Sequence, residues 1–183
     1  LQENEKMSID SVVAVFDETE LKAMFKDMLE NMNDSQKRFF IDRYGSVEEW
    51  ERHLIESASD EKTQQNFAKM LEWYGSKDAV KVAMKSAPKS EVFTSYQKRM
   101  GDIQRRIADK KGTDVNSFEI RQLVGEYDFV SKQLYQIKDP KALLLDIAKG
   151  YQENEELAKG IDSVYGDGAA KYIGEATEAF YIR

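Results

Sequence analysis

The chain has 183 residues, of which 41% are hydrophobic and 33% charged, so it is long enough and apolar enough to build a folded core. Its formal net charge of −7 disfavours direct binding to DNA or RNA, whose phosphates are also negative. The lack of cysteine excludes disulfides, thiolate metal sites and a cysteine nucleophile. No apolar run is long enough to cross a membrane. We therefore expect a cytoplasmic protein with no membrane partner.

Helix start and stop signals divide the chain, and no segment alternates cleanly enough to predict a strand. Capping boxes are expected at Asp17 and Ser46, and Pro88 and Pro140 are expected in first helical turns. The predicted helices are 21–31, 34–43, 46–58, 60–74, 76–86, 88–110, 117–137, 139–149, 154–164 and 167–181. The predicted fold class is all-α, with a compact multi-helix body.

Two connectors share a Tyr-Gly-Ser sequence, Arg43–Ser46 and Trp73–Ser76. In each, we expect the glycine to end one helix and the serine to cap the next. The sequences on either side of the two connectors agree poorly. A reused helix-to-helix connector therefore explains the repeated Tyr-Gly-Ser better than a duplication of a longer segment.

The helix that begins after Ser117 carries a wide apolar stripe at three-and-four spacing. It consists of Ile120, Leu123, Val124, Tyr127, Val130 and Leu134, and Phe129 and Tyr135 are expected to widen it. The last helix carries a stripe of small residues that permits close helix approach. Its members are Ala169, Ala170, Ile173, Ala176, Thr177 and Phe180.

No residue pattern predicts catalysis, a metal site or a cofactor. His53 is the only histidine, and its position is typical of a surface residue. The spacing of Asp162 and Asp167 does not fit a calcium loop. The acidic runs fall in first helical turns, where negative charge favours the helix dipole. We predict that the chain is not an enzyme.

Aromatic residues crowd the later two thirds of the chain, and tyrosine is the commonest of them there. Aromatic residues at helical spacing usually form a core. Tyrosines also supply polar tips in an apolar surrounding, as small-molecule pockets do. Both interpretations remain open from the sequence.

Four segments together resemble the TipAS antibiotic-recognition domain, the effector-binding half of certain MerR-type transcription activators. They are Trp73–Ala79, Asp114–Tyr135, Lys138–Pro140 and Gly150–Ala170, and the resemblance covers about residues 62–182. Their order and spacing carry the resemblance, since no single motif is strongly specific.

The resemblance implies a globin-like helical fold with a cleft for bulky, flat antibiotics. It also implies a winged helix-turn-helix domain ahead of this chain, so that DNA is bound only through a part that is missing here and the full-length protein is a homodimer. By this comparison Leu1–Met7 resembles the end of the dimerising helix, and Ile9–Asn33 resembles a mobile lead-in. We expect residues 1–60 to form this lead-in with extra helices, and 61–183 to form the effector-binding domain.

The resemblance and the aromatic pattern together define a predicted ligand site. Its expected lining is Trp73, Phe93, Tyr96, Met100, Tyr127, Tyr135, Lys138 and Tyr151. Some family members carry a cysteine just before the proline that matches Pro140, and they bind their ligand covalently. Lys138 lies at about that place here, so the hydrophobic small-molecule ligand is expected to bind without covalent chemistry. The alternatives are a helical protein-interaction module and a stand-alone drug-sequestering protein.

Overall fold

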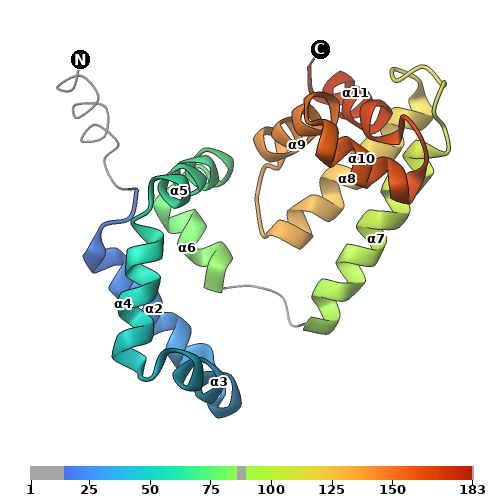
Figure 1. The fold of residues 1–183 in the computed structure, drawn as a ribbon. Coiled ribbons are helices and arrows are strands. Elements are labelled where there is room, and N and C mark those ends of the chain that lie inside the picture. The colour runs from blue at the N-terminus through green and yellow to red at the C-terminus, as the bar shows by residue number, and fades with distance from the viewer. Residues whose placement is uncertain (1–14, 86–89, 183) are drawn as a thin grey trace. The chain divides into compact units, whose positions relative to one another are not determined.

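The computed structural model describes residues 15–85 and 90–182 (Figure 1). All regular elements in these ranges are α-helices, which confirms the all-α prediction. The chain divides into two compact units, residues 1–71 and 72–183, and the division falls in the last turns of α5. Each unit is described by itself.

The first unit contains four helices around an aromatic core. They are α2 (Glu18–Asn31), α3 (Asp34–Tyr44), α4 (Val47–Ala58) and α5 (Glu61–Tyr74). The Trp50 ring stacks on Phe40 at 4.5 Å and meets the edge of Phe25 at 5.1 Å. These rings join α2 and α3 to α4, which lies against both helices.

A buried glutamine of α5, Gln64, connects this helix to Val15 and to the end of α4. The Gln64 side chain accepts a hydrogen bond from the Val15 backbone N–H and donates one to the Ala58 carbonyl. It is 5% exposed, and both its polar ends are therefore satisfied inside the unit.

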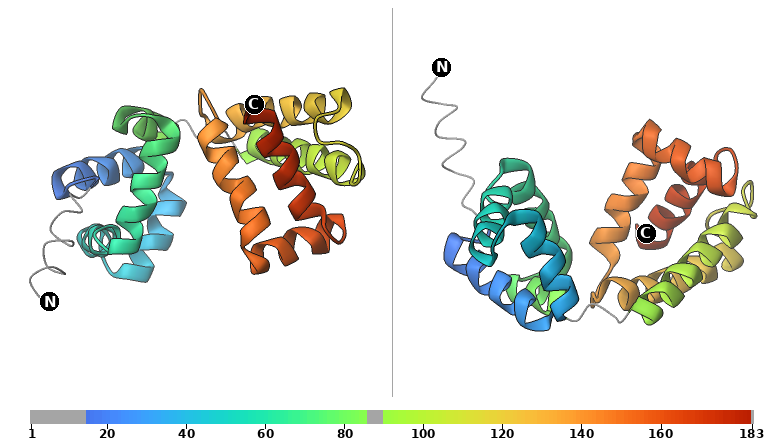
Figure 2. Two further views of the ribbon diagram at one scale, coloured as in Figure 1. Left: turned by 90° about the horizontal axis from the view of Figure 1, so that it is seen from above. Right: turned by 60° about the horizontal axis from the view of Figure 1, so that its bottom comes forward.

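The second unit begins with the end of α5 and contains α6 (Lys77–Lys85), α7 (Ser90–Ala108), α8 (Phe118–Tyr135), α9 (Lys141–Glu153), α10 (Glu155–Tyr165) and α11 (Ala169–Tyr181). Two pairs of helices form its body, α7 with α8 and α9 with α11. Figure 2 shows α9 and α11 side by side, with α10 joining them at one end.

Small residues allow α9 and α11 to approach closely. The stripe predicted for the last helix is buried from Ala169 to Thr177, and Gly174 lies within it. A Cβ added at Gly174 would come within 2.8 Å of the Ala148 carbonyl oxygen on α9. A larger residue therefore has no room at this crossing.

The local signals place most helix boundaries within three residues of prediction. Asp17, Ser46 and Ser117 accept hydrogen bonds from backbone N–H groups of the first turn, as expected for caps. Gly45 and Gly75 adopt positive φ angles of 97° and 86°, as the repeated connector predicts. The Ser46 and Ser76 hydroxyl groups cap the helices that follow.

The structure corrects three local predictions. Pro140 precedes α9 as its cap rather than lying in the first turn, and Asp139 accepts from the Lys141 N–H. The α9 helix continues to Glu153, beyond the end predicted at Lys149. Phe129 is 52% exposed instead of widening the buried face, since it lies two positions from Tyr127 and points to another side of α8. The prediction that Pro88 begins a helix falls outside the described residues.

Candidate functional site

Four tyrosines gather around one glutamine in the second unit. The Gln104 side-chain N–H donates to the Tyr151 hydroxyl at 3.1 Å, and the Tyr165 hydroxyl donates to Gln104 Oε1 at 3.3 Å. Gln104 also lies close enough to Tyr127 to lower the pKa of its hydroxyl, and Tyr135 packs against the same core. We call Gln104 and these four residues the tyrosine cluster.

Four helices supply the tyrosine cluster. Gln104 lies on the buried face of α7, and Tyr127 and Tyr135 lie about two turns apart on α8. Tyr151 belongs to the last turn of α9, and Tyr165 is the last residue of α10. The cluster therefore joins the α7–α8 pair to α9 and α10 through side chains.

Burial keeps the tyrosine cluster uncharged. It raises the pKa of Tyr127, Tyr135, Tyr151 and Tyr165 above the usual tyrosine value, because a phenolate loses its hydration there. For Tyr127 the negative charges that Tyr151 and Tyr135 carry as phenolates raise the pKa further, and the hydrogen bond to Gln104 opposes this. At neutral pH the cluster offers neutral donors and acceptors in an apolar surrounding.

The structure brings five of the eight predicted lining residues into or against one core. Met100, Tyr127 and Tyr151 are buried in it, and Tyr96 and Tyr135 pack against it from partly exposed positions. Their side chains pack together, so a ligand would have to part them. The predicted lining therefore stays a prediction.

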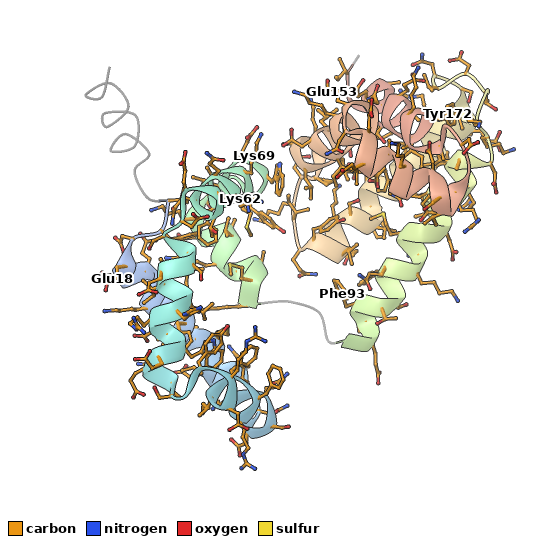
Figure 3. The ribbon with its side chains drawn as sticks, in the orientation of Figure 1. Glu18, Lys62, Lys69, Phe93, Glu153 and Tyr172 are labelled. Atoms are coloured by element: carbon orange, nitrogen blue, oxygen red, sulfur yellow. The ribbon has the colours of Figure 1, made fainter. Side chains whose placement is uncertain are left out.

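The other three predicted residues lie elsewhere. Phe93 is 38% exposed near the beginning of α7, where Figure 3 labels it, and Lys138 is exposed before α9. Trp73 is half-buried at the end of α5 and donates its indole N–H to Asp146 Oδ2 at 2.7 Å.

The prediction of the site missed two members of the tyrosine cluster. Gln104 lies one helical turn after Met100 and one turn before Ala108, and all three are buried. A polar residue on an apolar face was the signal that could have identified it. Tyr165 lies directly before Gly166 in the Gly150–Ala170 segment that carries the family resemblance, and this position was the signal that could have identified it.

A separate surface pocket of about 250 Å³ lies between α7 and α8. Arg106 pairs with Glu126 at 2.9 Å and Lys110 with Glu119 at 2.8 Å across it. Its lining is mostly charged, so it suits water and ions better than a bulky apolar ligand.

The described residues contain no group of three or more His, Asp or Glu side chains placed to hold a metal ion. In the same ranges no helix has the length and apolar character of a membrane span.

The family comparison covers the tyrosine cluster. A family model described as the TipAS antibiotic-recognition domain matches residues 67–180, which is more than half of the chain. The chain belongs to this family. The TipAS match extends from the middle of α5 almost to the end of α11 and includes every residue of the tyrosine cluster. Comparisons with curated proteins and with solved structures gave no significant match.

Membership of the TipAS family confirms the resemblance seen in the sequence. It makes the second unit a domain of the antibiotic-recognition type and leaves open which small molecule it recognises. The first unit lies almost wholly outside the TipAS match.

Proposed function

We propose that the chain binds a bulky, largely apolar and aromatic small molecule without covalent chemistry, as the effector domain of a MerR-type transcription regulator. The observation that carries this proposal is the tyrosine cluster, which lies inside the family match and combines apolar walls with neutral polar groups. Pockets for drug-sized ligands have this composition.

Binding without a covalent bond follows from the chemistry of the chain. It contains no cysteine, so it has no thiol to attack a ligand. Tyrosine hydroxyls whose pKa is raised by burial are poor nucleophiles near neutral pH, because almost none is ionised. Neither an enzymatic step nor a resident cofactor is part of the proposal.

Regulation requires that the ligand bind one conformation better than another. A ligand that separates Tyr127 from Tyr151 would shift α9 relative to α8, and so favour one arrangement of the helices. We propose that this shift is passed to a DNA-binding domain in the homodimeric full-length protein. Residues of the acidic chain itself do not contact DNA in this scheme.

A thermal-shift screen of chemically diverse hydrophobic antibiotics tests the binding proposal. A ligand present at a hundred times its Kd stabilises the native state by about 2.7 kcal/mol and raises the melting temperature. Flat responses across the whole set, with the chain shown to be folded by circular dichroism, would reject the drug-binding function.

Two further measurements separate the alternatives. Stabilisation by an amphipathic helical peptide, and by none of the antibiotics, would favour a protein-interaction module. The coding sequence upstream of Leu1 distinguishes a regulator from a sequestering protein. If no helix-turn-helix domain is encoded there, the MerR part of the proposal is wrong and the ligand-binding part is unaffected.

A further inference from the structure

Tyr165 is held differently from Tyr127 and Tyr151, the two tyrosines of the cluster that are buried. It is partly exposed, whereas Tyr127 and Tyr151 are buried. Its helix, α10, contains no fully buried residue, and Gly166 follows with a φ of 106°. The Tyr165 side chain therefore has fewer packing restraints than the side chains of Tyr127 and Tyr151.

Three residues of α7 surround the Tyr165 side chain, and together they define the place that its ring occupies. An added Cβ at Gly101 would lie 3.4 Å from the Tyr165 hydroxyl oxygen, so the backbone of α7 at Gly101 lies close to this hydroxyl group. The Arg105 guanidinium lies 5.4 Å from the ring centroid. Gln104 Oε1 accepts the hydroxyl hydrogen bond at the inner end.

We propose that this place is a ligand subsite, which Tyr165 fills in the free protein and a phenol-like ring of the ligand takes over, donating its hydroxyl to Gln104 Oε1. This inference rests on the proposed function and specifies the ligand class for it. The ligand carries a flat, neutral, electron-rich ring with one hydrogen-bond donor at its edge.

The groups around the subsite select for that chemistry. Arg105 favours an electron-rich ring face and repels a cationic ring. Gln104 Oε1 is an acceptor and needs a donor. Arg105 attracts an anionic group, but a carboxylate would lose hydration next to Gln104 Oε1, which is itself an acceptor and has no hydrogen to donate.

The exchange replaces one hydrogen bond to Gln104 Oε1 by another. The ligand hydroxyl replaces a Tyr165 hydrogen bond that is long at 3.3 Å, and Gln104 keeps its bond to Tyr151 at 3.1 Å throughout. Displaced, the Tyr165 hydroxyl regains its hydration, because it starts from a partly exposed position.

Three naphthalene probes of matched size test the subsite. 2-Naphthol is neutral and has a donor, 2-methoxynaphthalene is neutral without a donor, and 2-naphthoate is anionic. Each is titrated by its fluorescence into the full chain at neutral pH. We expect 2-naphthol to bind about tenfold more tightly than the other two, the value of one hydrogen bond to a buried acceptor.

Variants of the chain locate the binding. Gln104→Met should weaken 2-naphthol about tenfold and leave 2-methoxynaphthalene unchanged. Tyr165→Ala should strengthen 2-naphthol, because the competing ring is gone, and Tyr165→Phe should do so more weakly. Tyr172→Phe is the matched control, since Tyr172 donates to the Thr113 carbonyl outside the cluster. Circular dichroism verifies that each variant is folded.

The results separate the subsite from the proposed function. Equal affinities for the three probes, or 2-naphthol binding that neither Gln104→Met nor Tyr165→Ala changes, would overturn the subsite. If an antibiotic from the screen still stabilises the chain in that case, the proposed function stands. If no probe and no antibiotic binds, both are rejected.

Discussion

The crossing of α9 and α11 gives the sharpest prediction about stability. Replacing Gly174 by alanine puts a Cβ 2.8 Å from the Ala148 carbonyl oxygen and 2.9 Å from Gln152 Cγ. The glutamine side chain can rotate away, but the carbonyl belongs to the α9 backbone and cannot. Separating the helices should cost about 1–3 kcal/mol, as other overpacked cores do.

Alanine also favours the helix over glycine by about 1 kcal/mol, which offsets part of that cost. The net effect expected for Gly174→Ala is therefore a loss of up to about 2 kcal/mol. For a unit of this size, each kcal/mol lost lowers the melting temperature by roughly 4–8 °C. Hydrogen exchange at the α9 and α11 amides measures the loss within the second unit alone.

Gly160→Ala is the matched control. Gly160 is an exposed residue of α10 with no atom within 4 Å of an added Cβ, so only the helix preference changes. We expect a gain of about 0.5–1 kcal/mol there. If Gly174→Ala stabilises the chain as Gly160→Ala does, the close approach of α9 and α11 does not limit stability and our account of the crossing is wrong.

Three further outcomes are expected. The pKa of Tyr127 is raised mainly by burial, so the unfolded chain releases that proton first; stability should be intact below about pH 10 and fall above it by about 1.4 kcal/mol per pH unit for this group. Urea midpoints at neutral and alkaline pH should therefore fall less steeply with pH in Tyr127→Phe, and equal slopes would contradict this. Asp162 accepts hydrogen bonds from the Gly168 and Ala170 N–H groups, so Asp162→Ala should cost about 1–2 kcal/mol in urea unfolding, whereas an unchanged midpoint would show that water replaces this cap. Lys110→Ala breaks an exposed ion pair with Glu119 and should cost less than about 1 kcal/mol, less still in high salt, and a larger loss would mean that the pair is shielded from solvent.

The helices and their buried faces could be predicted because both depend on neighbours in the sequence. Ser46 and Ser117 cap their helices through atoms three residues away, and the six-residue stripe of α8 is buried as its spacing indicates. Phe129 shows the limit of the pattern. Its apolar character suggested burial, but its angle around α8 leaves it exposed, with Arg99 about 6.0 Å from its ring centroid.

The candidate site was predictable only in part. Tyr127, Tyr135 and Tyr151 were expected together, and the structure brings them together around Gln104. Gln104 was missed because its hydrogen-bond partners lie on other helices, Tyr151 on α9 and Tyr165 on α10, and the sequence does not show which residues pair across helices. Phe93 and Lys138 were proposed from family position and aromatic or charged character, and the structure leaves both exposed.

The sequence by itself determined the fold class, most helix boundaries, the faces that are buried and the impossibility of capture by a thiol of this chain. Those features follow from local backbone chemistry, from periodicity and from composition. Only the tertiary structure decided which polar group Tyr151 and Tyr165 share, and that the Tyr165 ring is less restrained than the buried Tyr127 and Tyr151. Hydrogen bonds such as Tyr165 to Gln104 join residues 61 positions apart, and no local pattern specifies a partner at that distance.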